Sequence, residues 1–173
     1  MKSLFIVAIS ISLAALVSSC GSSGPQVSSG LLASSDSTWM DVTTTNGTAR
    51  STCEATPANC TMQDMASGLK WSKKFPLTTT WNGATSACAN LTHNGQKAGT
   101  WHLPSKEQLV AANANGITRA ARENWLTLTD MQVYFWSSSS DSSTSGSAWI
   151  VNLAVARALP DSKNFSYAVI CVQ

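Results

Sequence analysis

Charged residues are scarce in this chain of 173 residues, where Asp, Glu, Lys and Arg together make up 12%. The 11 basic and 9 acidic side chains nearly balance, which excludes a nucleic-acid-binding surface or a polybasic membrane-binding segment. Histidine is scarcer still, with only His93 and His102, and no Cys-x-x-Cys pair occurs. The sequence therefore predicts no metal site and no cofactor.

Long apolar runs are also lacking, except for one that spans residues 4–17 behind Lys2. This layout is typical of a secretory signal, and the run is too short for a stable membrane span. It ends in Leu-Val-Ser-Ser-Cys, which resembles the bacterial lipobox, whose cysteine is acylated and becomes the first residue after cleavage. We therefore expect residues 1–19 to be a signal peptide and Cys20 to carry a lipid.

The segment after Cys20 is rich in Ser and Gly up to Ser37 and almost uncharged, as in a flexible tether. A lipid-anchored protein needs such a spacer to hold its domain away from the bilayer. We expect an exported protein anchored to the membrane through Cys20. Gly21 stands where an inner-membrane retention signal would carry Asp, which favours the outer membrane by analogy with enteric bacteria.

Residues 38–173 are enough for one domain with its own core. They contain Cys53, Cys60, Cys88 and Cys171, and an even number of cysteines in an oxidising compartment predicts two disulfides. Four cysteines allow three pairings.

The first half of the domain predicts two hairpins and a helix. Asn46-Gly47 between β-branched residues is a strong hairpin signal, and a second hairpin turns near Ser67-Gly68 into a strand over 69–72. A helix over 81–91 is expected because apolar residues recur at helical spacing behind Thr80, a suitable N-cap. The sequence His-Asn-Gly at 93–95 then ends it.

The segment Gly99–Leu109 holds His102, Lys106 and Glu107, and it raises the question of catalysis. Trp101 and Leu103 alternate with His102 as in a short strand with one buried face. Ser105 and Gln108 form a capping box for a helix that stops at Gly116. Because no nucleophile or carboxylate is placed by the sequence to work with His102, we interpret the segment as scaffold and not as a catalytic site.

The last third predicts a short third helix within 117–130 and an antiparallel meander. Its three strands begin at Tyr134, Ser147 and Tyr167, and polar loops over 140–146 and 155–166 connect them. Strands followed by helices and a meander indicate an α+β fold. Four tryptophans are expected to pack where the helices meet the sheet: Trp71, Trp101, Trp136 and Trp149.

Six motifs follow one another along the chain in this order: GLKWSK, WNGATSACANL, WHLPSKEQL, YFWSSSS, AWIVNL and YAVICVQ. Through them the chain resembles, from about Thr61 to Gln173, a bacterial family, the Lcl C-terminal domain family, also called domain of unknown function 1566. The resemblance rests on the ordered set of motifs and not on any one of them. His102 stands where the family usually has arginine, and Gln108 where it usually has glutamate.

The resemblance implies a C-type-lectin-like fold, also used by formylglycine-generating enzymes, with two main helices packed on antiparallel sheet and a C-terminal β-meander. In that fold the variable loops and the face of the last strands commonly hold ligand. The resemblance also puts Cys88 in contact with Cys171. We predict the pairs Cys88–Cys171 and Cys53–Cys60, so that two disulfides staple the domain.

Three functions fit these features. The first is a cell-surface, adhesin-like binding domain, since the family's namesake binds host polysaccharides. Calcium-dependent sugar binding is disfavoured because the usual Glu-Pro-Asn or Gln-Pro-Asp loop is absent. The second is an envelope module that binds another protein.

The third is an enzyme related to formylglycine-generating proteins, which would need a reactive cysteine pair near a copper site. We expect a structural bridge between Cys88 and Cys171, and therefore no enzyme. The sequence leaves oligomerisation open.

If the domain binds a ligand, polar residues on or beside the loops of the meander are the candidates. They are Asp141, Ser143, Asn152, Arg157, Lys163 and Asn164.

Overall fold

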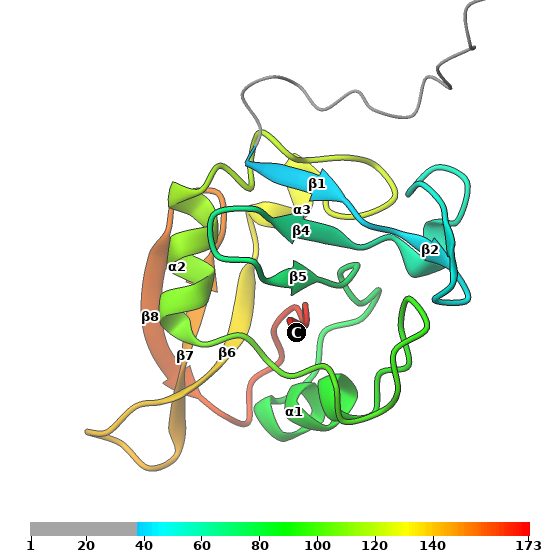
Figure 1. Ribbon diagram of the computed structural model, residues 1–173. Coiled ribbons are helices and arrows are strands. Elements are labelled where there is room, and N and C mark those ends of the chain that lie inside the picture. Colours follow the sequence, from blue (N-terminus) through cyan, green and yellow to red (C-terminus); the bar gives the residue numbers. More distant parts are fainter. Residues whose placement is uncertain (1–37) are drawn as a thin grey trace, which may run out of the picture.

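The structure, a computed structural model, describes residues 38–173, so the predicted signal peptide, Cys20 and the tether lie outside the described residues. Its strands form antiparallel sheets in the orders β1-β4-β5, β2-β3 and β6-β7-β8, which with the helices make an α+β fold, as predicted. No helix among these residues is long and apolar enough to cross a membrane. The elements, labelled in Figure 1, are β1 (Trp39–Asp41), β2 (Thr44–Thr45), β3 (Ala49–Arg50), the 3-10 helix η1 (Pro57–Asn59), β4 (Met62–Asp64), β5 (Lys70–Trp71), α1 (Trp81–Ala89), α2 (Lys106–Ala114), α3 (Leu128–Met131), β6 (Tyr134–Ser140), β7 (Ser147–Asn152) and β8 (Arg157–Ser162).

Both predicted hairpins are present. Asn46 and Gly47 turn β2 into β3 with φ angles of 52° and 81°, the left-handed conformation that an Asn-Gly turn supplies most easily. Gly68, with a φ of 78°, lies in the turn between β4 and β5. The strand that follows is shorter than predicted and comprises Lys70–Trp71.

The two main helices begin where their caps predict. Thr80 caps α1 by accepting a hydrogen bond from the Gly83 N–H. At the start of α2, Ser105 Oγ accepts from the Gln108 N–H at 3.1 Å while Gln108 Oε1 accepts from the Ser105 N–H at 2.7 Å, which completes the capping box.

Before α2, Trp101 and Leu103 are buried and His102 between them is exposed, as the alternation predicts. The segment from Trp101 to the start of α2 therefore has the structural roles that the sequence indicates.

The third helix is shorter than the predicted region. Only Leu128–Met131 is helical, behind a capping box of Thr127 and Asp130. The preceding residues form turns closed by a bridge between Arg122 and Leu126. Ile117, Trp125 and Leu126 each reach the core from these turns, so apolar spacing there reflects a folded loop and not a helical stripe.

The meander differs from the prediction in its third strand. The region 155–166, expected to be a loop, contains β8, which pairs with β7 from Ser147↔Ser162 to Asn152↔Arg157. Pro160 lies in β8, and this is tolerated because β8 is the edge of the sheet, where a missing N–H leaves no ladder bond unmade. The expectation that the meander's third strand begins at Tyr167 is therefore wrong.

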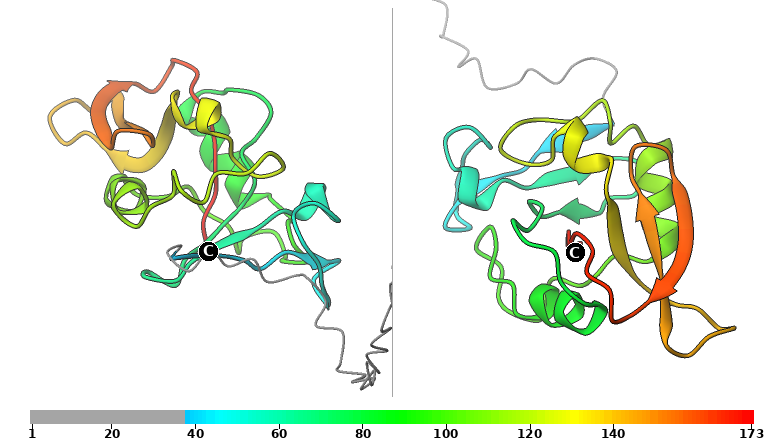
Figure 2. Two further views of the ribbon diagram at one scale, coloured as in Figure 1. Left: turned by 90° about the horizontal axis from the view of Figure 1, so that it is seen from above. Right: turned by 180° about the vertical axis from the view of Figure 1, so that it is seen from behind.

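Residues 167–173 instead run between the two larger sheets and pair with several segments. Val172 bridges both Trp71 and His102, Tyr167 bridges Thr79, and Ala168 bridges Phe135. Figure 2 shows this segment between the meander on one side and β1-β4-β5 on the other. We call residues 167–173 the central segment. Its residues from Ala168 to Val172 are all buried.

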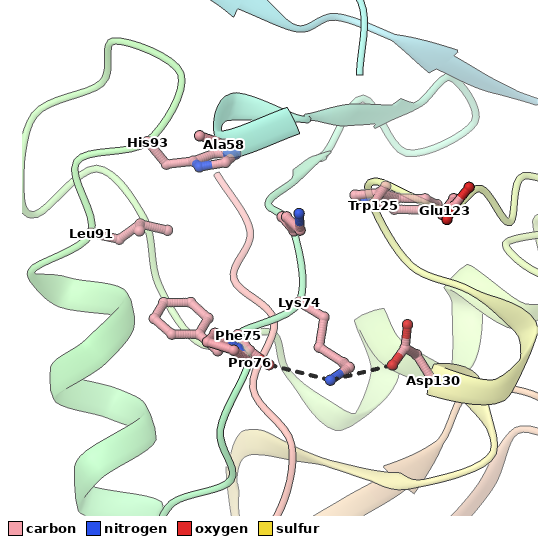
Figure 3. Close-up of a pocket in the computed structure, with 10 residues that line it drawn as sticks. Ala58, Lys74, Phe75, Pro76, Leu91, His93, Glu123, Trp125 and Asp130 are labelled. Atoms are coloured by element: carbon pink, nitrogen blue, oxygen red, sulfur yellow. Dashed lines mark hydrogen bonds and ion pairs between the residues drawn. The ribbon is translucent and has the colours of Figure 1, made fainter. Parts of the chain in front are cut away.

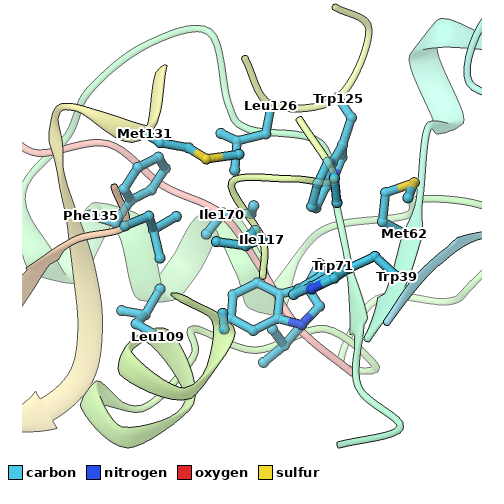
Figure 4. Packing of buried hydrophobic residues seen from close by; sticks show 14 of the residues in the cluster. Trp39, Met62, Trp71, Leu109, Ile117, Trp125, Leu126, Met131, Phe135 and Ile170 are labelled. Atoms are coloured by element: carbon cyan, nitrogen blue, oxygen red, sulfur yellow. The ribbon is translucent and has the colours of Figure 1, made fainter. Parts of the chain in front are cut away.

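The core consists of two clusters on either side of the central segment. The larger one gathers Trp39, Trp71 and Trp125 with side chains from α2, α3 and β6, as Figure 4 shows. The smaller one holds Trp101, Trp136 and the Cys88–Cys171 disulfide. Trp71, Trp101 and Trp136 are buried as expected, whereas Trp149 is half-buried, with Lys106 Nζ at 4.2 Å from the centre of its ring.

Two disulfides close the domain, and they join the pairs that we predict from the sequence. Cys53 and Cys60 are joined across a separation of 7 residues, and Cys88 and Cys171 across 83. All four cysteines have no exposed surface. The longer bridge attaches α1 to the central segment.

Candidate functional site

The strand register of the meander decides which of its side chains share a face. Directly paired residues of neighbouring antiparallel strands point to the same side of the sheet. Tyr134 pairs with Asn152, and Asn152 pairs with Arg157. Further along the same strands, Ala148 pairs with Asp161. Residues an even number apart on one strand point to the same side, so the pair of Ala148 and Asp161 lies on the same face as the pair of Asn152 and Arg157.

We call the accessible part of this side of the meander the open face. It consists of the row Tyr134, Asn152 and Arg157, then Leu159 and Asp161 of β8, and Tyr167, which contacts Asp161 and Tyr134 from the central segment.

Packing explains why this face stays accessible. The opposite face contributes Val151 to the larger core cluster, together with Leu109 and Ala112 of α2. On the side of the open face, Ala148 and Ile150 are buried in the smaller cluster, but Leu159 in edge strand β8 is only partly buried against it. The core therefore covers the middle of this side and leaves its β8 edge in contact with solvent.

A hydrogen bond fixes the centre of the open face. The Tyr167 hydroxyl donates to Asp161 Oδ2, and the Ser162 N–H donates to Asp161 Oδ1 at 2.7 Å. The bond to Asp161, together with burial and the charge of that carboxylate, raises the pKa of Tyr167 to about 12. The phenol therefore stays protonated, and the carboxylate is held in one orientation, ready to accept further hydrogen bonds.

Two further aromatic rings pack against Tyr167. The Tyr134 and Tyr167 rings lie 6.3 Å apart at an interplanar angle of 71°, and Trp136 and Tyr167 lie 5.0 Å apart at 84°. Both are edge-to-face arrangements, which aromatic pairs favour. Tyr134 and Tyr167 are only partly buried, so the open face presents ring surface beside polar groups.

The structure places only two of the six predicted ligand residues on the open face. Arg157 is exposed, and none of its side-chain atoms is bonded within the described residues. The side chain of Asn152 is hydrogen-bonded to the turns at this end of the meander. Its Nδ2 donates to the Gln132 carbonyl at 2.6 Å, and its Oδ1 accepts from the Ala154 N–H at 3.0 Å.

The other four candidates lie at the opposite end of β7 from Asn152 and Arg157, about 17 Å away for six residues at about 3.3 Å each. Asp161 of the open face pairs with Ala148 near that same end. Asp141 accepts hydrogen bonds from the Ser143 N–H and hydroxyl, which lower the pKa of Asp141 and close a local turn. Lys163 donates to Ser140 Oγ at 3.0 Å and lies 4.4 Å from the centre of the Trp81 ring. Asn164 is exposed beside it.

Tyr134, Asp161 and Tyr167 were not among the candidates from the sequence. Asp161 lies in the same expected loop, 155–166, as Arg157 and Lys163, but nothing in the sequence marks it as the partner of Tyr167. The sequence does contain one indication of this face. Tyr134 and Trp136 lie two residues apart in an expected strand, which puts both rings on the same side of it.

The raised pKa of Tyr167 bears on the chemistry available to this face. Its phenol is a weaker acid than an ordinary tyrosine, so near neutral pH almost none of it is the phenolate that could act as a base or nucleophile. The cysteines of the described region are all in disulfides. Within residues 38–173, no group of three or more His, Cys, Asp or Glu side chains is placed to hold a metal ion.

Comparison with known proteins identifies one family. The family model of the Lcl C-terminal domain matches residues 60–173, which include the two main helices, the meander and the central segment. No curated protein matches the chain.

Proposed function

Since this chain belongs to the Lcl C-terminal domain family, we propose that it is a non-catalytic, calcium-independent binding domain of adhesin type whose ligand is a glycan. The observation that carries the proposal is the open face, where the partly buried rings of Tyr134 and Tyr167 pack edge to face and Tyr167 holds the carboxylate of Asp161. Sugars present apolar ring faces and hydroxyl groups, and such a surface offers a partner for each.

The proposal includes the mode of display. We infer that residues 1–19 direct export, that Cys20 is acylated, and that the tether up to Ser37 holds the domain away from the bacterial outer membrane. The support is the sequence alone: an apolar run, a lipobox-like ending and a spacer rich in Ser and Gly.

We also infer a C-type-lectin-like arrangement for the domain. Two main helices lie beside antiparallel sheet, and the end of the chain returns between the sheets to pair with several segments. The resemblance implies that the variable loops and the face of the last strands hold ligand, and the open face is our proposal for that surface.

Glycan-array binding of the purified protein tests the proposal. Tyr134→Ala and Arg157→Ala should each weaken binding of any glycan found, by about tenfold for the ring, since aromatic contacts contribute about 1 kcal/mol or more. Arg119→Ala is the matched control for Arg157→Ala, because Arg119 is also exposed but follows α2 and is not on the open face. Absence of binding to every glycan, with capture of an envelope protein instead, would favour the protein-interaction function.

The anchor has its own test. Cys20→Ser should abolish incorporation of labelled fatty acid and release the protein from the membrane fraction or leave it unprocessed. Unchanged lipid labelling in this variant would contradict the lipoprotein assignment and leave the open face unaffected.

A further inference from the structure

A pocket of about 440 Å³ lies away from the open face and shares no residue with it. Figure 3 shows its walls. They come from the segment that follows β5, with Lys74, Phe75 and Pro76; from Leu91 and His93 after α1; and from the region of Trp125 and Asp130 around the start of α3.

Two lysines and two carboxylates line this pocket, and one of the lysines makes no ion pair within the described residues. Lys74 Nζ is 3.3 Å from Asp130 Oδ1 and also donates to the Phe75 carbonyl. Lys73 has no carboxylate partner within the described residues, and its Nζ makes only a long contact of 3.5 Å with the Pro57 carbonyl. A half-buried lysine that makes no ion pair can bind the carboxylate of a ligand.

His93 contributes a hydrogen-bond acceptor. The side chain is 6% exposed, and its Nε2 lies 3.0 Å from the Cys60 carbonyl. A carbonyl oxygen only accepts, so Nε2 carries the proton. Burial, and to a lesser degree the charge of Lys73, lower the pKa of His93 and keep the ring neutral near pH 7. Nδ1 is then an acceptor, and it has no partner within residues 38–173.

The remaining wall is apolar. Phe75 and Leu91 are partly buried and Pro76 is exposed, and all three line the pocket. They provide a surface of carbon atoms next to Lys73 and His93. Glu123 and Asp130 also line the pocket, and their carboxylates would repel a ligand that carries two negative charges.

We propose that this pocket binds a small hydroxy acid with one carboxylate and an apolar body. The ligand's carboxylate pairs with Lys73, its hydroxyl donates to His93 Nδ1, and its apolar body packs on Phe75, Pro76 and Leu91. A neutral polyol would leave Lys73 unpaired, and a phosphate would face two carboxylates. This inference does not depend on the proposed glycan-binding function.

Titration calorimetry of the purified protein with phenyllactate tests the proposal. Phenyllactate should bind, while phenyllactamide, which lacks the charge, and 3-phenylpropionate, which lacks the hydroxyl, should each bind about tenfold more weakly. Lys73→Met should weaken phenyllactate binding by a similar factor. Lys70→Met is the matched control, because Lys70 is a nearby, half-buried lysine that does not line the pocket.

Three outcomes would overturn the proposal: no binding of phenyllactate at concentrations up to about 10 mM, equal affinity for the acid and its amide, or unchanged affinity in a folded Lys73→Met protein. Because the probe comparison uses the unaltered protein, it decides the question even if Lys73→Met does not fold. Tyr134→Ala should leave phenyllactate binding unchanged, so failure of the pocket and failure of the open face are distinguishable.

Discussion

The two histidines of this chain have opposite environments. His102 is exposed on a segment whose backbone pairs with Val172. The His93 ring is buried against Trp101, with ring centres 5.4 Å apart, and is bonded to the Cys60 carbonyl. Burial lowers the pKa of His93 below its usual value of 6.5, so the folded protein favours the neutral ring.

This shift makes stability depend on pH. Between the folded-state pKa of His93 and 6.5, the unfolded chain binds more protons than the folded one, so the free energy of unfolding falls as pH falls through this range. We expect the melting temperature to decrease from pH 7 to pH 5. The decrease should be smaller in His93→Gln, while His102→Gln should behave like the unaltered protein. Equal pH profiles for all three proteins would contradict the assignment.

Sequence patterns predicted burial better than they predicted roles for single residues. The alternation of Trp101, His102 and Leu103 assigned the inside and outside of that segment correctly. His93 was interpreted only as part of a helix stop, because nothing in His-Asn-Gly indicates that a distant Cys60 carbonyl will bind the ring. Contacts between residues far apart in the chain are set by tertiary packing, which local pattern does not encode.

Among the elements, the turn after α1 is joined to the β2–β3 hairpin. Asn94 Oδ1 accepts from the Thr44 N–H at 2.6 Å, and Asn94 Nδ2 donates to the Val42 carbonyl at 3.1 Å. The backbones meet at two glycines, since a Cβ on Gly95 would lie 2.1 Å from the Gly47 Cα. Neither glycine leaves room for a side chain.

We expect Gly95→Ala to be far more destabilising than Gly99→Ala. Both glycines have positive φ, 75° and 85°, but a Cβ on Gly99 would meet nothing within 4 Å. Gly99→Ala should therefore lower the free energy of unfolding by about 1 kcal/mol, the cost of the backbone conformation. Gly95→Ala should lower it by a further 1–3 kcal/mol or so because of the steric overlap. Urea denaturation measures the free energy of unfolding of both variants. Equal losses in the two variants would contradict the expected steric overlap at Gly95.

Local signals predicted the beginnings of elements better than their extent. The caps at Thr80 and Ser105 and the turn at Asn46-Gly47 are where the sequence indicates, because each depends on a few neighbouring residues. Strand β8 was missed because Pro160 and polar neighbours are typical of a loop. Only its position at the sheet edge makes that composition compatible with a strand.

At the scale of the whole molecule, the two disulfides differ in the length of chain between the cysteines they join. The chain-entropy relation assigns about 4–5 kcal/mol to the separation of 83 residues between Cys88 and Cys171, and about 2.5 kcal/mol to the 7 between Cys53 and Cys60. We expect Cys88→Ala to lower the melting temperature by roughly 5–10 °C more than Cys53→Ala. Differential scanning calorimetry under non-reducing conditions measures this. A greater loss for Cys53→Ala would contradict the expected order.

The candidate site shows where sequence reasoning ends. The ordered motifs were enough to predict the family, and the order of the expected elements was enough to predict the α+β fold. The polar candidates for ligand binding stay a prediction. These patterns did not show that Asp141 and Arg157 lie at opposite ends of the strands, or that Asp161 meets Tyr167. Both facts follow from strand register, which depends on how β8 pairs.

The position of the central segment also bears on how fast the domain can fold. Residues 167–173 are far along the chain from most of the segments they pair with, which include Trp71, Thr79, His102 and Phe135. Neither core cluster is complete without them, because Ala168, Ile170 and Val172 belong to one and Val169 and Cys171 to the other. Completion of both core clusters therefore depends on contacts of long sequence separation, and such contacts form slowly.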